Sequence, residues 1–284
     1  MFAEQLGRNR KDNVWIFIMY GVAALFLVLF IFPYLYMLLS SFKPSNEVIS
    51  TSPTFFPKAF SIENYIQLSQ YEGMGKFFLN SIVAATVGTL ICLILGSMAS
   101  YAISRTAASK LSGFFLVLVL CLKMIPMSSI AVPIYALIQK FGFYDYLPAL
   151  VVVYAAVNMP FVLWMMISFF KAIPVDMDEA ASIDGASPIV SFRKVILPIT
   201  IPGMISTGIF TFLLAWNDFL LALLLTSSSA KTVPVALSEF LTAYNLDLGP
   251  MTAAATLFSF PVIVISFFLQ KYLVSGMMAG SVKE

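Results

Sequence analysis

The sequence predicts an all-α integral membrane protein with six transmembrane helices, and three observations support this prediction. First, 60% of the 284 residues are hydrophobic and 11% are charged, whereas soluble domains are about 45–50% apolar and about 25% charged. Second, the apolar residues form six long runs, each interrupted by at most one charge. Third, the basic residues are distributed unevenly between these runs. The chain is also far too apolar for a disordered protein.

Each apolar run can cross a bilayer as a helix, which takes about 20 residues. The first run follows basic residues, as in a signal peptide. It is too long for a signal sequence and has no small-x-small cleavage site, so we expect a retained span. After it, Ser61 predicts the N-cap of a short helix. The predicted spans are 14–42, 77–104, 111–139, 147–170, 196–229 and 248–270.

The charges between the spans predict the orientation of the chain. An even number of spans places both termini on one side, and the segments on that side hold ten Lys and Arg residues against five opposite. The positive-inside rule therefore predicts that both termini are cytoplasmic. We expect a cytoplasmic N-terminal segment (1–13) and one transmembrane domain (14–284). This domain includes a cytoplasmic loop (171–195) and a cytoplasmic tail (271–284).

The composition excludes several classes of function. Histidine, the commonest general base and metal ligand, is absent. Cys92 and Cys121 both lie in apolar runs, which argues against a disulfide framework or a thiolate zinc site. The net charge of +2 is too small for a nucleic-acid footprint. We therefore expect no catalytic residues, no metal site and no nucleic-acid partner.

The 171–195 loop predicts two short helices joined by a glycine elbow. Pro174 suits the first turn of a helix, and the acidic residues after it meet the positive end of the helix dipole. Gly185 favours the left-handed conformation that ends a helix. Ser187 and Pro188 are a typical N-cap and first residue of a second helix. The loop is either a docking element for another protein or an ordinary amphipathic linker.

One spacing in this loop is more specific. Glu179-Ala180-Ala181 is followed after three residues by Gly185, and after nine more by Val195-x-Leu197-Pro198. This spacing resembles the signature of the permease subunits of ABC importers, with Val195 where the family usually has isoleucine. Further segments resemble the carbohydrate branch, which includes the maltose and multiple-sugar permeases. They are residues 63–65, 80–81, 99–102, 184–186, 215–218 and 276–283.

The resemblance implies the type I ABC importer permease fold, with the loop at 174–198 acting as a coupling helix that docks into a cytoplasmic ATPase dimer. The chain has no Gly-x-x-x-x-Gly-Lys-Ser/Thr phosphate loop. ATP and Mg²⁺ would therefore be bound by the partner ATPase, and this chain would bind no cofactor. The other implied partners are a homologous second permease subunit, an extracytoplasmic solute-binding protein, a sugar substrate and the lipid bilayer.

The resemblance also implies which residues contact the ATPase. The coupling residues are Glu179, Ala180, Ala181, Asp184, Gly185, Leu197 and Pro198. In the tail, the weaker candidates for the same interface are Gly280, Ser281, Val282 and Lys283.

Polar residues inside the spans are candidates for a translocation pathway: Lys123, Ser128, Asn158, Asn217 and Asp218. An ionised lysine in a span costs about 2.5–3.5 kcal/mol on insertion scales, so we expect Lys123 to face protein or water. Alternatively, Lys123 pairs structurally with Asp218 or extends toward a membrane interface. Kinked or broken helices are predicted at Pro126, Pro133, Pro160, Pro198 and Pro202.

The sequence thus predicts a non-enzymatic transport subunit of the cell membrane, a permease that imports sugars or oligosaccharides with energy from a separate ATPase. Three alternatives stay open. An ion-coupled secondary transporter would need coupling carboxylates and usually internal repeats. A permease for an acidic sugar or sugar phosphate would give Lys123 a role. An intramembrane enzyme would need a nucleophile, such as a serine paired with Lys123.

Overall fold

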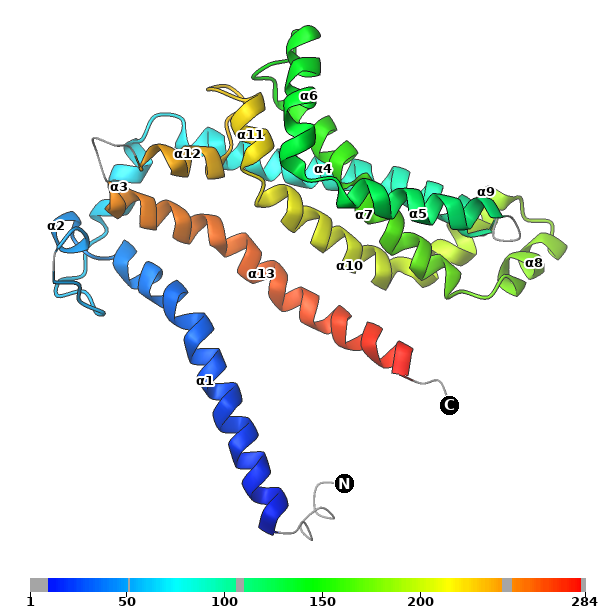
Figure 1. Cartoon of the computed structure of the whole chain (residues 1–284), viewed down its shortest axis with the longest axis horizontal. Coiled ribbons are helices and arrows are strands. Elements are labelled where there is room, and N and C mark those ends of the chain that lie inside the picture. The colour runs from blue at the N-terminus through cyan, green and yellow to red at the C-terminus, as the bar shows by residue number, and fades with distance from the viewer. Residues whose placement is uncertain (1–9, 51, 106–109, 242–246, 282–284) are drawn as a thin grey trace. The chain divides into compact units, whose positions relative to one another are not determined.

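The computed structural model describes residues 10–50, 52–105, 110–241 and 247–281, and it describes no side chains in 10–14, 110–112 and 268–281. The regular elements of the described residues are all helices (Figure 1). They divide into two units. Unit 1 comprises Met1–Tyr71 and Phe240–Leu257, and unit 2 comprises Glu72–Glu239 and Phe258–Glu284.

Unit 1 contains the first long helix and the short helices that follow it. These are α1 (Arg10–Ser41), α2 (Ser45–Val48) and α3 (Glu63–Gln70), together with the first part of α13 (Leu248–Ser281). Asn64 on α3 is buried and donates hydrogen bonds to the carbonyls of Ser41 and Lys43 at 3.0 and 2.8 Å. The predicted short helix is confirmed, but the prediction of Ser61 as its N-cap is wrong. Its N-cap is Ile62, and the Ser61 hydroxyl accepts the N–H of Glu63.

Unit 2 is built around three long helices, α4 (Met74–Arg105), α7 (Leu147–Lys171) and α10 (Leu197–Trp216). Small residues let these helices approach closely, as is common between membrane helices. A Cβ at Gly96 of α4 would lie 2.6 Å from Val162 of α7. A Cβ at Gly203 of α10 would lie 2.6 Å from the Phe169 ring of α7. Glycine at these two positions therefore sets the spacing of the bundle.

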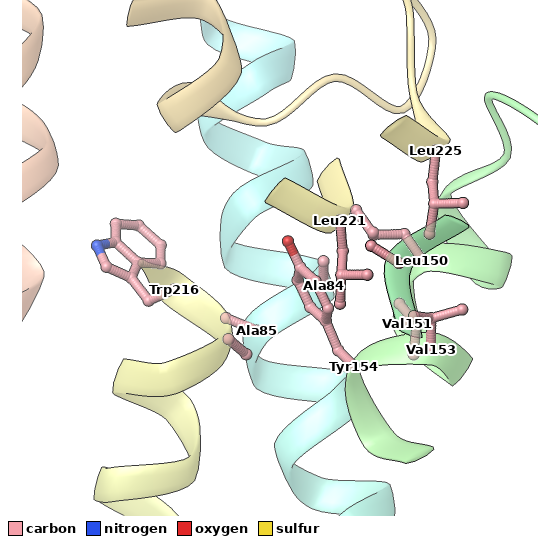
Figure 2. Close-up of a cluster of buried hydrophobic side chains, with 11 residues drawn as sticks. Ala84, Ala85, Leu150, Val151, Val153, Tyr154, Trp216, Leu221 and Leu225 are labelled. Atoms are coloured by element: carbon pink, nitrogen blue, oxygen red, sulfur yellow. The ribbon is translucent and has the colours of Figure 1, made fainter. Parts of the chain in front are cut away.

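The core of unit 2 lies where α4, α7 and α10 meet a further short helix, α11 (Leu220–Leu225). Ala84 and Ala85 of α4 are completely buried there. Figure 2 shows them surrounded by larger side chains from the other three helices, among them Tyr154 and Trp216. The Trp216 indole N–H donates to the carbonyl of Phe258 at 3.2 Å. The small residues on α4 thus leave room for the large side chains of the neighbouring helices, and the two sets pack against each other.

Five helices of the described residues are long and apolar enough to span a bilayer. They correspond to the first, second, fourth, fifth and sixth predicted spans. The remaining run, 111–139, is broken at Pro126, as predicted: α5 (Lys110–Met124) and α6 (Met127–Lys140) meet at an angle of 89°. Pro126 lies at this bend and cannot continue the helix before it. The predicted number of six spans is reached only if α5 and α6 together are counted as one span.

The fifth and sixth predicted runs also differ from the helices in extent. The fifth is broken after Trp216, where the backbone leaves the helix at Asn217 and resumes it at α11. The helix α12 (Val233–Glu239) then follows beyond the predicted end of this run. The sixth was predicted to end at residue 270, but α13 continues to Ser281. Elsewhere the helices continue through their prolines, as α7 does at Pro160.

Candidate functional site

The connection between α7 and α10, residues 172–196, lies at one end of the long helices of unit 2 (Figure 1). It contains α8 (Asp176–Ile183) and α9 (Pro188–Ser191). The sequence predicted two separate short helices. The second is not separate, because α9 continues through a single π-helical segment, Phe192–Ile196, directly into α10.

The glycine elbow after α8 is confirmed. Gly185 has φ +84°, in the left-handed region, and its N–H donates to the carbonyl of Ser182 at 3.0 Å. The N–H of Ala186 reaches back to the carbonyl of Ala181 at 2.9 Å. This pair of bonds is the Schellman motif, which satisfies the last carbonyls of a helix and usually needs glycine at this position. The sequence therefore fixes how the chain leaves α8.

The predicted coupling residues do not all face the same surroundings. Glu179, Ala180, Asp184, Gly185 and Pro198 are exposed, Leu197 is half-buried, and Ala181 is buried within unit 2. Apolar side chains of the same connection also face outward, with Ile183 87% and Ile189 70% exposed. Exposed apolar side chains beside acidic ones are typical of a protein-binding surface.

A cluster of polar side chains ties α8 to α4. The Asp178 carboxylate accepts hydrogen bonds from the Tyr101 hydroxyl at 2.5 Å, the Ser191 hydroxyl at 2.7 Å and Nε of Arg105 at 2.6 Å. Arg105 also donates from Nη1 to the carbonyls of Phe170 and Ile173, at the end of α7 and just after it. One arginine thus joins α4, α7 and α8.

Electrostatics favour the charged form of this cluster. The side chains of Arg105 and Asp178 are only 14% and 16% exposed. Burial by itself raises the pKa of Asp178, but the hydrogen bonds from Tyr101 and Ser191 and the charge of Arg105 outweigh it. The pKa of Asp178 is therefore below its ordinary value, and the ion pair persists at neutral pH.

Sequence reasoning did not identify this cluster as a unit. Asp178 was assigned to the helix dipole, and Arg105 served only to orient the chain. A usable signal was present, because one basic residue ends the second span and one acidic residue starts the loop on the same side. The sequence separation of 73 residues hid the pairing.

The second candidate site is a cavity of about 610 Å³ in unit 2. Its lining residues are Met127, Phe161, Phe210, Leu213, Leu214, Asn217, Asp218, Phe219 and Leu220. The break between α10 and α11 supplies its polar groups, Asn217 and Asp218. Most of the remaining wall is aromatic or aliphatic, the composition typical of pockets for small organic ligands.

The structure brings some of the predicted pathway residues together and places others elsewhere. Asn217 and Asp218 line the cavity, and Ser128 directly follows Met127 of its wall. Lys123 is exposed, and its Nζ lies 5.6 Å from the centre of the Phe161 ring. Asn158 is buried, is not among the lining residues, and donates to the carbonyl of Tyr154.

Lys123 and Asp218 do not form an ion pair within 4 Å in the part of the chain that the structure describes. The Asp218 carboxylate instead accepts the Tyr154 hydroxyl at 3.0 Å and the N–H of Ala222 at 3.1 Å. Asp218 thereby fixes the first turn of α11. The aromatic wall was missed by sequence reasoning, because phenylalanine is abundant throughout the spans.

The predicted tail residues can be described only in part. Gly280 and Ser281 belong to the last turn of α13 by their backbone. Val282 and Lys283, like the side chains of this turn, lie outside the described residues.

Comparison with known proteins adds independent information. Residues 92–279 match the family model described as "Binding-protein-dependent transport system inner membrane component". The probable ABC transporter permease protein y4oR of Sinorhizobium fredii is 36% identical over 89% of this chain and 91% of its own length. The trehalose/maltose transport system permease protein MalG of Thermococcus litoralis is 34% identical over 92% and 94%.

Solved structures share the fold. A chain of a bacterial ABC transporter involved in the import of the acidic polysaccharide alginate superposes with a TM-score of 0.79 at 19% identity. The match covers 93% of this chain and 98% of that one. A second structure shows the bacterial alginate transporter in complex with a periplasmic protein that carries an alginate pentasaccharide, with a TM-score of 0.69 at 13% identity.

Proposed function

This chain belongs to the family of binding-protein-dependent transport system inner membrane components, the membrane permeases of ABC transporters, and we propose that it is the permease subunit of an ATP-driven sugar or oligosaccharide importer. In this proposal both termini are cytoplasmic, so the α7–α10 connection is cytoplasmic too. The observation that carries the proposal is this connection, with its exposed acidic and apolar side chains and its fixed attachment to α4 and α7.

The connection is suited to transmit force. A separate ATPase dimer, which holds ATP and Mg²⁺, contacts the exposed face around Glu179, Ala180 and Ile183. Its closure moves α8, and the Asp178–Arg105 pair passes that movement to α4. The continuous backbone from α9 through the π-helical segment passes it to α10. Movement of α8 is transmitted only if both connections, the Asp178–Arg105 pair and the continuous backbone into α10, are rigid.

The cavity at the break between α10 and α11 is the proposed part of the translocation pathway. Asn217 and Asp218 provide hydrogen-bonding groups for hydroxyls, and the Phe161, Phe210 and Phe219 rings provide apolar faces. A carboxylate and an amide suit a polyhydroxy solute. A homologous second permease completes the pathway, and a solute-binding protein outside the membrane delivers the sugar. The name of the trehalose/maltose permease from Thermococcus litoralis supports this substrate class.

Uptake measurements test the proposal. We expect right-side-out membrane vesicles that contain the assembled transporter, with its solute-binding protein added outside, to accumulate radiolabelled trehalose or maltose when ATP is inside. Accumulation should stop without ATP and persist when ion gradients are collapsed with an ionophore. Uptake that survives ATP depletion but stops with the ionophore would contradict the proposal and indicate a secondary transporter.

A further inference from the structure

The segment 226–232, between α11 and α12, has no regular secondary structure, yet its backbone N–H groups converge on one side chain. The Asp145 carboxylate accepts the N–H of Ser227 at 2.9 Å, Ser228 at 3.2 Å, Ser229 at 2.8 Å and Ala230 at 2.9 Å. Consecutive N–H groups that point at one anion form a backbone nest. Here the anion is part of the same chain.

The backbone of Asp145 takes part as well. Its N–H donates to the carbonyl of Leu225, the last residue of α11, at 2.9 Å. Carbonyls in the last turn of a helix have no partner within the helix. Asp145 has φ +55° and is the one non-glycine residue with positive φ among the described residues. Such a conformation is uncommon for a residue with a side chain and persists where its surroundings fix it.

The carbonyls of the same segment are satisfied from another helix. Nδ2 of Asn80 on α4 donates to the carbonyls of Ser229 and Lys231 at 3.0 and 2.9 Å. The hydroxyl of Ser81 accepts the N–H of Val233, the first residue of α12. Asp145 and Asn80, 65 positions apart, thus pair four N–H groups and two carbonyls of this segment.

These contacts affect the cavity because α11, which contributes to its wall, is very short. The helix has only six residues, and Leu220 at its start lines the cavity. A helix this short is not stable by itself, so its position depends on contacts at its ends. Asp218 holds the first turn through the N–H of Ala222, and Asp145 holds the last carbonyl. One acidic residue therefore fixes each end of α11.

We propose that Asp145 is a positioning residue, which fixes the far end of α11 and thereby the wall of the cavity. Its relevance to transport rests on the proposed function, but the contact with α11 can be tested without it. Burial by itself raises the pKa of Asp145, but the four backbone N–H groups outweigh it and lower the pKa well below its ordinary value. The carboxylate therefore stays ionised at neutral and mildly acidic pH.

Asp145→Asn tests the proposal, because asparagine also tolerates positive φ but replaces one acceptor oxygen with an NH₂ group that faces the N–H donors. Glu72→Gln is the matched control, since it removes an exposed carboxylate of unit 2 that lies just before α4. Hydrogen–deuterium exchange of the intact transporter is the readout. In Asp145→Asn we expect residues 220–230 to exchange about tenfold faster or more, with residues 150–158 unchanged.

The extent of the faster exchange decides between a positioning residue and a simple loop cap. Faster exchange in both 226–230 and the α11 amides supports the proposal. Faster exchange in 226–230 alone, or in neither, overturns it. Asp145→Gly, which adopts positive φ freely, provides the same test if the asparagine variant is not recovered from membranes.

Transport gives a second and separate readout. If the cavity wall is displaced, the sugar concentration for half-maximal uptake should rise several-fold in Asp145→Asn and stay unchanged in Glu72→Gln. An unchanged value in Asp145→Asn would overturn the link to the cavity. Failure of the wild-type protein to transport any sugar would instead count against the proposed function and leave the exchange result standing.

Discussion

Gly185→Pro is expected to abolish sugar uptake while the assembled transporter still hydrolyses ATP. Proline fixes φ at about −65°, whereas Gly185 has φ +84°. Proline also removes the N–H that Gly185 donates to the carbonyl of Ser182. The substitution therefore redirects the chain after α8 and separates movement of the docking surface from movement of α10. The variant should still insert into the membrane, because the long helices of unit 2 are unaffected.

Gly185→Ala is the matched control for this prediction. A Cβ at position 185 meets no atom within 4 Å, so only backbone strain opposes alanine. This strain is about 1–2 kcal/mol, which should leave the elbow largely intact. The measurement is the number of sugar molecules imported per ATP hydrolysed in proteoliposomes. A normal ratio in the proline variant would show that the elbow has no part in coupling.

Arg105→Ala is expected to lower uptake by about tenfold or more, since a hydrogen bond to a charged group in a partly buried site contributes about 1.5–3 kcal/mol. The substitution leaves the Asp178 carboxylate without its counter-charge and removes the donors to the carbonyls of Phe170 and Ile173. The hydrogen bonds that Asp178 then keeps come from the hydroxyls of Tyr101 on α4 and Ser191 on α9, so the link from α8 through Arg105 to α7 is lost. ATP hydrolysis should fall less than uptake.

Lys171→Ala provides the control for Arg105→Ala, because it removes an exposed positive charge from the end of α7. Equal uptake by the Arg105→Ala and Lys171→Ala variants would contradict a role for the Arg105–Asp178 pair.

The pH dependence of coupling gives a further check. The pKa of Asp178 is lower in the folded protein, so the stabilisation is present above its unfolded value, about 3.9, and is lost as the pH falls through the lower folded value. The wild-type coupling ratio should thus be constant between about pH 5 and pH 8.

Local patterns explain why much of this fold could be predicted. Apolar runs long enough to span a bilayer gave five of the long helices, because that signal depends only on composition over about 20 residues. The elbow at Gly185 followed from local chemistry in the same way, since the Schellman motif is formed within a few residues. Both features lie within one stretch of chain.

The breaks in the helices could not be predicted with the same success. Five prolines were candidates for a kink or break, but the sharp bend lies at Pro126, while α7 continues through Pro160. Whether a proline breaks a membrane helix depends on whether neighbouring groups satisfy the freed carbonyls. That information lies in the tertiary contacts and not in the residues next to the proline.

The sites depend on contacts between distant residues. Arg105 and Asp178 are 73 positions apart, and Asp145 and Ser227 are 82 apart. Arg105 had a local role as a topology signal and Asp178 as an acid near the start of a helix, which gave no reason to pair them, and nothing near Asp145 in the sequence singled it out. The aromatic wall of the cavity was hidden for a different reason, since 27 phenylalanines made no single one distinctive.

The central claim is that the exposed face of α8 docks onto a separate ATPase, and photocross-linking tests it most directly. A photoreactive amino acid replaces Ile183, which is 87% exposed on this face, and, as a control, Phe60, which is 74% exposed in unit 1 and extracytoplasmic in the proposed orientation. After illumination of intact membranes, mass spectrometry identifies the cross-linked partner. We expect the ATPase subunit, recognised by its phosphate-binding loop, from position 183 only. An ATPase adduct from position 60, or none from position 183, would contradict the account.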